Sequence, residues 1–208
     1  MKPFFINSRA LMPVEIEAKM KIESAEAVLA ALRERGAVEL GSQIETDSFF
    51  DTDDRELLAA DEGLRLRVAV DVKTNQSKAL LTHKGPVGPG ALKKRQEIET
   101  AVGNPETTGR VLEQLGYVQC LRYQKRRQSW KLDTCKVEID EIPYLGRFVE
   151  IEGPSEEAVM RVREMLGLGG HTLIKSSYVA MLTAYLQERG ESTTEIMLPE
   201  SGRISKAG

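Results

Sequence analysis

Apolar and charged residues alternate along the segment PVEIEAKMKI, residues 13–22. Every second residue from Val14 is apolar, and every second residue from Glu15 is charged. Because successive side chains of a strand point to opposite faces, this segment predicts a strand with one apolar face and one fully charged face. The ordinary explanation for such a strand is a sheet with one face in water.

The same alternation returns in six further segments: GLRLRV (63–68), ALLTHKG (79–85), KRQEIET (94–100), QKRRQSW (124–130), KVEID (136–140) and FVEIE (148–152). Their polar faces carry both signs of charge. The side chains that share a face are Arg65 with Arg67, Thr82 with Lys84, Arg95 with Glu97 and Glu99, Lys125 with Arg127, Glu138 with Asp140, and Glu150 with Glu152. A solvent face is normally more varied, so the recurrence of arginine and glutamate weakens the ordinary explanation.

Helices are predicted between and after these strands. One spans 24–36, with Ser24 as its N-cap and Gly36 as its C-cap. A second, at 105–116, opens with Pro105. Further helices are expected at 155–167 and 171–190, a short helical piece within 51–63, and another strand at 42–51. Antiparallel strands with helices packed outside them constitute an α+β arrangement.

The apolar faces of the strands need cover, which helices outside the sheet can supply. The charged faces would then point inward, towards one another. Burying an unpaired charge costs a prohibitive amount of free energy, and burying an ion pair gains almost none. This interior therefore cannot be a dry core. A sheet curled into a barrel with a water-filled lumen meets these conditions.

A lumen lined by both signs of charge favours a particular ligand. Clustered Arg and Lys bind polyanionic phosphate, and the remaining carboxylates are compatible with it if divalent cations lie between them and the phosphate oxygens. His83 and His171 are isolated, so an oxygen-only ligand set favours Mg²⁺ or Mn²⁺ over zinc. The residues alone therefore predict a metal-dependent site for a triphosphate-like ligand.

Length and composition limit the class of protein. A chain of 208 residues suits one large domain, or at most two small ones. A net charge of −3 gives no overall attraction to nucleic acid or to an anionic membrane, and no run of about 18 apolar residues occurs. Cys120 and Cys135 have no metal or redox spacing and are expected to be free thiols of a cytoplasmic protein.

Three segments are expected along the chain. Residues 1–12 are interpreted as an N-terminal leader or an upstream start, with Met12 as an alternative initiator. Residues 13–188 form the domain that contains the alternating strands. Residues 189–208 lack periodicity and are predicted to be a flexible tail.

A family resemblance rests on the order of the charged motifs. EIEAK (15–19) matches the ExExK signature of the CYTH superfamily, also called triphosphate tunnel metalloenzymes. The signature is followed by RLR (65–67), Lys84, RQEIE (95–99), KRR (125–127), VEIDEIPYLGRFVEIE (137–152) and KSSY (175–178). ExExK alone would be a weak match, but this combination, spread over residues 13–188, is specific.

The resemblance implies an eight-stranded antiparallel closed β-barrel, or tunnel, that binds a triphosphate with Mg²⁺ or Mn²⁺. The superfamily includes class IV adenylyl cyclases, thiamine triphosphatases, inorganic tripolyphosphatases and RNA 5′-triphosphatases. Inorganic triphosphate, ATP and thiamine triphosphate are therefore the expected ligands, with no membrane or nucleic-acid partner and a possible homodimer. Residues 4–13 do not match the His-Phe leader expected of the cyclases, so hydrolysis and cyclisation both stay open.

The same resemblance assigns residues to roles. The metal ligands it implies are Glu15, Glu17 and Glu150, helped by Glu152 and Asp140. The phosphate ligands it implies are Lys19, Arg65, Arg67, Lys84, Lys125 and Arg127, of which Lys84, Lys125 and Arg127 are also assigned to catalysis. Arg95 is expected either to contact phosphate or to pair across the lumen, and Lys175 either to bind substrate or to lie on the surface.

Two other classes of function stay open. A non-catalytic module that binds polyphosphate or nucleotide would carry the same basic residues, although the intact ExE and EIE carboxylates argue against it. A structural β domain rich in ion pairs would carry the same alternation, and there Glu15→Ala would leave metal and triphosphate binding unchanged.

Overall fold

A computed structural model describes residues 14–199 of the chain. Its strands are β1 (Val14–Ile22), β2 (Val38–Asp51), β3 (Gly63–Asp71), β4 (Ser77–Lys84), β5 (Lys93–Ala101), β6 (Val118–Leu132), β7 (Cys135–Ile142), β8 (Gly146–Glu152) and β9 (Glu195–Ile196). Its helices are α1 (Glu26–Glu34), α2 (Glu56–Ala59), α3 (Pro105–Gln114), α4 (Glu156–Met165) and α5 (Tyr178–Arg189). The expected leader at 1–12 lies outside the described residues.

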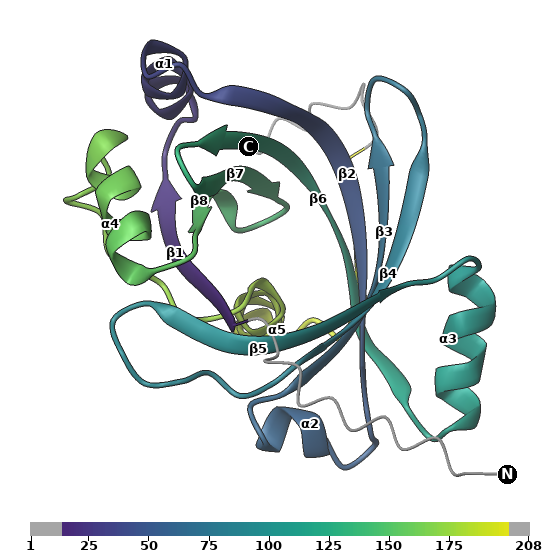
Figure 1. The fold of residues 1–208 in the computed structure, drawn as a ribbon. Coiled ribbons are helices and arrows are strands. Elements are labelled where there is room, and N and C mark those ends of the chain that lie inside the picture. The colour runs from purple at the N-terminus through teal and green to yellow at the C-terminus, as the bar shows by residue number, and fades with distance from the viewer. Residues whose placement is uncertain (1–13, 200–208) are drawn as a thin grey trace, which may run out of the picture.

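Strands β1 to β8 close into an antiparallel barrel (Figure 1). Their order is β2-β3-β4-β5-β1-β8-β7-β6, and the pairing of β2 with β6 closes the ring. These are the two longest strands, of 14 and 15 residues. The predicted eight-stranded closed barrel, with helices outside it in an α+β fold, is confirmed.

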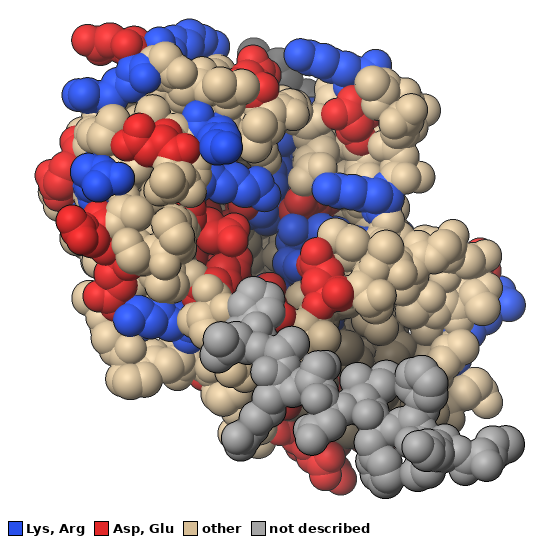
Figure 2. Space-filling model, viewed as in Figure 1, with Lys and Arg blue, Asp and Glu red and all other residues tan. Residues whose placement is uncertain are grey.

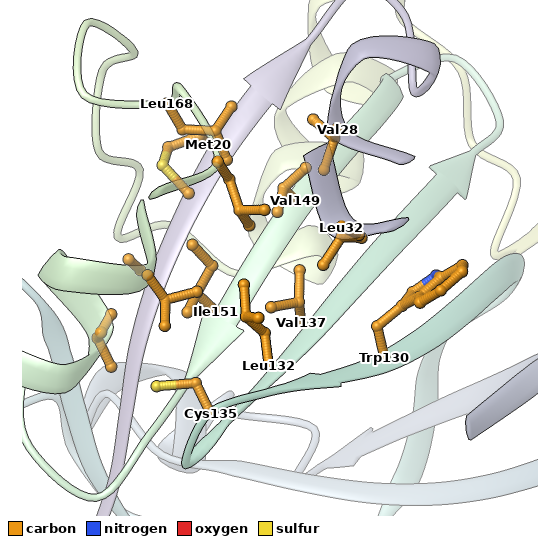
Figure 3. Packing of buried hydrophobic residues seen from close by; sticks show 14 of the residues in the cluster. Met20, Val28, Leu32, Trp130, Leu132, Cys135, Val137, Val149, Ile151 and Leu168 are labelled. Carbon is orange, nitrogen blue, oxygen red and sulfur yellow. The ribbon is translucent and has the colours of Figure 1, made fainter. Parts of the chain in front are cut away.

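The largest apolar core lies between the outer face of the barrel and helices α1 and α4 (Figure 3). Met20 of β1 and Val149 and Ile151 of β8 are fully buried there, against Val28 and Leu32 of α1. Each such side chain stabilises the fold by about 1.5–3 kcal/mol relative to the exposed state. The apolar faces of the strands are thus covered by helices outside the barrel. The charged faces of the strands therefore point into the interior.

A second core packs α5 against the barrel wall. Leu182 and Leu186 of α5 lie against Leu121 of β6 and Phe148 of β8. A third, smaller cluster, formed by Phe50, Leu66 and Leu112, joins α3 to β2 and β3.

Helix α5 begins later than the pattern of residues 171–190 suggested. The N–H of Ile174 donates to the carbonyl of Lys19 over 2.8 Å, which ties the preceding segment to β1 in an extended form. The Ser177 hydroxyl then caps the helix by accepting from the N–H of Ala180 at 3.3 Å. The helix therefore begins at Tyr178, after a cap that satisfies one N–H group of its first turn.

The segment after α5 differs from the expected flexible tail in one respect. Glu195 and Ile196 form β9, which runs parallel to β6 and pairs with Arg122 and Tyr123. Ile196 is 2% exposed and packs into the α5 core. Its burial offers a physical reason for the order of this short segment, although a single apolar residue leaves no periodic signal.

The helices of the described region are also too short or too polar to cross a lipid bilayer.

Candidate functional site

The inward side chains of the barrel line a cavity of about 1160 Å³. Every one of the eight barrel strands contributes at least one charged side chain to its wall. Lys, Arg, Asp and Glu side chains are visible in the hollow at the centre of the face shown in Figure 2. A second hollow, of about 1120 Å³, lies outside the barrel beside α1 and the β7–β8 turn, and it gathers no comparable cluster of cations.

Strand register places opposite charges face to face in the lumen. Asp47 of β2 stands opposite Arg67 of β3, and Asp140 of β7 stands opposite Arg127 of β6. Arg67 donates to both carboxylate oxygens of Asp47, at 2.6 and 2.7 Å, and its Nη1 lies 2.9 Å from Glu45. Such bidentate pairs are the strongest of the charge-assisted hydrogen bonds.

A second hub surrounds Arg127 and Lys125 of β6. The Arg127 guanidinium contacts Asp140, Glu138 and Glu150, the last at 2.6 Å. The Lys125 ammonium lies 3.0 Å from Asp140 and 3.2 Å from Glu45. Removing one partner of a buried pair leaves an uncompensated charge. Loss of either partner is therefore expected to lower the free energy of unfolding by about 3–5 kcal/mol.

The pKa values of these carboxyl groups follow from this pairing. Burial opposes ionisation of Glu45, but Arg67 and Lys125 outweigh it and hold the pKa well below its usual range. Burial likewise opposes ionisation of Glu150, and Lys19 and Arg127 lower its pKa well below the usual value. For Asp47, burial is outweighed by Arg67, and the pKa is about 2. These carboxylates are ionised at neutral pH.

Lys19 of β1 is held from several sides. Its ammonium lies 3.2 Å from Glu150 and 3.5 Å from Glu17, and it donates to the carbonyl of Ser176 at 3.1 Å. The ring of Tyr178 lies beneath it, with 4.1 Å from the nitrogen to the ring centroid. Lys19 is 2% exposed, so its position in the lumen is set by these contacts.

Lys84 of β4 and Lys93 of β5 form a third basic group near Glu15, Glu17 and Glu97. Lys84 pairs with Glu97, and Lys93 donates to Glu17 at 3.0 Å. Burial and then Arg65 lower the pKa of Lys84 to about 8, although Glu15 and Glu97 act in the opposite direction. Lys84 is thus the lumen cation that loses its proton most readily among those with a resolved shift.

Arg65 is only weakly paired with carboxylates in the lumen. It donates to the Thr82 hydroxyl at 3.2 Å, and its nearest carboxylate, Glu99, is 3.6 Å away. Its buried Nε has no hydrogen-bond partner among the described residues. This guanidinium therefore retains donor capacity for an anion.

Arg95 and Lys175 occupy different positions from the other expected substrate ligands. Arg95 donates to the backbone carbonyls of Gly85 and Asp61 at 2.7 and 2.8 Å, which ties together the loops that follow β4 and α2. Lys175 is exposed at the cavity edge and donates to the carbonyl of Gly90. Both border the cavity, but their nitrogens are engaged with backbone.

The expected metal ligands come from β1, β7 and β8. Within residues 14–199, no three His, Cys, Asp or Glu side chains are arranged to hold a metal ion. The donor chemistry nevertheless fits Mg²⁺ or Mn²⁺, because these groups are carboxylates. Burial and then the Glu15 carboxylate raise the pKa of Glu152, and burial also raises that of Glu15. Crowded carboxylates of this kind are stabilised by a cation.

Several lumen residues were not assigned a role from the sequence: Glu45, Asp47, Lys93, Glu138 and Tyr178. Gln43, Glu45 and Asp47 do alternate along β2, but their neighbours Thr46 and Ser48 are polar, which hides the pattern. Lys93 lies just before the segment at 94–100, and the pairing with Glu17 shows its place beside β1. Tyr178 belongs to the KSSY segment of the resemblance, but its place in the lumen depends on contacts with β1 and β6.

Comparisons with known proteins agree with this geometry. The sequence model of the CYTH domain family matches residues 13–178. "Putative adenylate cyclase MJ0240" of Methanocaldococcus jannaschii is 25% identical over 177 residues, which cover 81% of this chain and 98% of that protein.

Two solved structures show the same fold. The PH1819 protein of Pyrococcus horikoshii OT3 has a TM-score of 0.73 at 25% identity, and the match covers 82% of this chain and 99% of that one. "Putative adenylyl cyclase HpAC1" of Hippeastrum has a TM-score of 0.62 at 19% identity, over 88% of this chain and 98% of that one.

Proposed function

The chain belongs to the CYTH domain family, and on this premise we propose that it is a divalent-metal-dependent enzyme that acts on a triphosphate inside the barrel. One observation carries the proposal. Basic side chains from β1, β3, β4 and β6 converge on one cavity: Lys19, Arg65, Arg67, Lys84, Lys125 and Arg127. A linear triphosphate offers many acceptor oxygens along one axis, which matches cations distributed along a tunnel.

The basic residues would bind and orient the substrate. Arg65, with free donor capacity, is suited to donate the first hydrogen bonds to phosphate, while Arg67 and Arg127 are fixed by their carboxylate partners. Holding the phosphate chain straight between opposite walls aligns the attacked phosphorus with its leaving group. Lys84, Lys125 and Arg127 would stabilise the negative charge of the transition state.

A divalent ion would be held by Glu15, Glu17 and Glu150, with Glu152 and Asp140 as nearby oxygen donors. When bound, Mg²⁺ or Mn²⁺ would neutralise phosphate oxygens and polarise the attacked phosphoryl group. Glu17 and Glu150 already contact Lys19, so the residues that face the metal and those that face the phosphate are adjacent.

Two reactions fit the same lumen. Water attacking the terminal phosphorus would give a triphosphatase, whereas the 3′-hydroxyl of ATP attacking the α-phosphorus would give cyclic AMP and pyrophosphate. The M. jannaschii relative bears a cyclase name, while the Hippeastrum protein of the same fold is described as having a dominant triphosphatase activity.

Apolar side chains also line the cavity, which favours an organic triphosphate as a substrate. They include Leu57 and Leu58 of α2 and Ala180 and Ala184 of α5. Leu58 is 67% exposed, a large apolar surface beside the phosphate-binding lumen. Apolar lining of this kind suits a ring or other organic group attached to the phosphate chain.

Product analysis tests the proposal. The protein is incubated with inorganic triphosphate, ATP or thiamine triphosphate in Mg²⁺ or Mn²⁺, and orthophosphate, pyrophosphate and cyclic AMP are quantified. We expect at least one substrate to be turned over, and Glu17→Gln to reduce that turnover by at least about a hundredfold.

The outcomes separate the alternatives. Unchanged turnover in excess chelator contradicts the metal role. Tight binding of all three compounds without any product supports the non-catalytic binding module, and no binding at all supports the structural β domain.

A further inference from the structure

Tyr178 opens α5 at the wall of the lumen, far from its neighbours in sequence. The segment before it is fixed to β1 by two hydrogen bonds: the N–H of Ile174 donates to the Lys19 carbonyl, and the Lys19 ammonium donates to the Ser176 carbonyl. The first turn of the helix therefore has a defined position relative to the β1 site residues.

The ring of Tyr178 is held by three neighbours. The nitrogens of Lys19 and Lys125 lie 4.1 and 5.1 Å from its centroid, within range of cation–π attraction. Phe148 packs against it edge-on, with centroids 5.2 Å apart and an interplanar angle of 67°. The ring thus contacts two of the basic residues assigned to phosphate.

The hydroxyl of Tyr178 is different from the ring. The residue is 5% exposed and borders the lumen cavity, yet its hydroxyl has no hydrogen-bond partner among residues 14–199. Buried hydroxyl groups almost always have a partner, and one without any costs stability. Burial and then Glu150 and Asp140 raise its pKa well above the usual value, so the oxygen keeps its proton and is a donor.

We propose that the Tyr178 hydroxyl is a direct substrate ligand, which donates a hydrogen bond to a phosphate oxygen of the triphosphate held by Lys19 and Lys125. This inference rests on the proposed function of the lumen. An anion bound by these two ammonium groups lies beside the ring that both contact, and we assign to it the ring's hydroxyl, a buried donor without a partner among residues 14–199. The alternative is that Tyr178 is only an aromatic support for the two lysines.

The substitution Tyr178→Phe separates these roles, because it keeps the ring and removes only the hydroxyl. Affinity for inorganic triphosphate is measured by calorimetric titration in EDTA, and kcat and KM are measured in Mg²⁺. We expect the variant to bind inorganic triphosphate about ten- to a hundredfold more weakly, as for the loss of a hydrogen bond to a charged group. Without ligand, its melting temperature should be unchanged or higher, since a buried hydroxyl without a partner is removed.

Matched variants complete the test. Tyr185→Phe alters a tyrosine of the same helix that stacks on Tyr144 outside the lumen, at 5.0 Å between centroids, and should leave affinity unchanged. Tyr178→Leu also removes the ring and should weaken binding further. Wild-type affinity in Tyr178→Phe overturns this inference and assigns the tyrosine the supporting role alone. If the wild-type protein itself binds no inorganic triphosphate, with or without Mg²⁺, the proposed function and this inference both fail.

Discussion

At the scale of single residues, the site is a set of charges that already have partners. Arg67 has Asp47 and Glu45, Arg127 has Asp140 and Glu150, and Lys19 has Glu150 and Glu17. A triphosphate that enters must share these cations with the carboxylates. The added negative charge is tolerated best if a divalent cation enters with it, so binding of metal and substrate should be coupled.

Lys84 makes the site sensitive to pH. Its pKa of about 8 means that its charge is lost as the pH rises through this value. A bound anion favours the charged ammonium, so affinity for triphosphate should fall as pH rises through 8, by up to about tenfold per pH unit. Titrations with inorganic triphosphate between about pH 7 and pH 9 measure this slope.

Lys84→Arg is the control, because a guanidinium stays protonated throughout this range. Its affinity should be nearly flat with pH. The stability of the fold should change in the opposite direction and increase with pH. Above a pKa of about 8 the unfolded chain binds more protons than the native one, so the free-energy cost of burying Lys84 decreases as the pH rises. A wild-type affinity that stays flat to about pH 9 contradicts a phosphate contact by Lys84.

At the scale of elements, α5 has two functions on two faces. Leu182 and Leu186 are buried against the barrel, while Ala180, Thr183, Ala184 and Gln187 line the cavity. The second set recurs at the spacing of one helical face. The helix therefore anchors itself through its apolar face and offers short side chains to the cavity, which leaves room for a substrate group.

Ala184→Trp tests whether that room is used. The indole should fill part of the cavity beside α5, so kcat/KM for the organic triphosphate that the enzyme accepts should fall at least about tenfold. Turnover of inorganic triphosphate, which has no organic group, should change less than about threefold. Steady-state assays with both substrates give the ratio.

Glu188→Trp places the same indole on an exposed α5 position outside the cavity lining. It should leave the turnover of both substrates unchanged. An equal loss for both substrates in Ala184→Trp would mean that the organic group lies elsewhere or that the helix has moved.

At the scale of the whole molecule, the closed barrel ties the lumen charges to global stability. Pairing of β2 with β6 removes the open sheet edges and brings Glu45 opposite Lys125. A ligand that binds only the closed barrel stabilises the entire fold, because the unfolded chain has no comparable array of cations.

Inorganic triphosphate at about a hundred times its dissociation constant should therefore add about 2.7 kcal/mol to the free energy of unfolding. For a chain of this size the melting temperature should rise by roughly 5–10 °C. Calorimetric or fluorescence melting measures the shift, with orthophosphate, a smaller anion, as the control. The absence of any shift at saturating triphosphate would contradict binding in the lumen.

Much of the fold and part of the site were determined by local sequence. The two-residue alternation of EIEAK, RLR and FVEIE decided which side chains lie inside, because strand geometry links sequence parity to the face of the sheet. Capping by Asn104 and Ser155 likewise placed the starts of α3 and α4. The charged lumen and the helices that cover the barrel follow from these patterns.

Only the tertiary structure decided which charges meet. Lys19 and Ser176 are 157 residues apart, and Arg127 reaches Glu150 across two strand pairs, so these contacts depend on register and closure that no local pattern encodes. The same holds for Arg95, whose alternation places it inward but whose guanidinium binds loop carbonyls. The sequence determined which face of a strand each side chain occupies. The closed barrel determined which side chains meet, and it left the Tyr178 hydroxyl without a partner among residues 14–199.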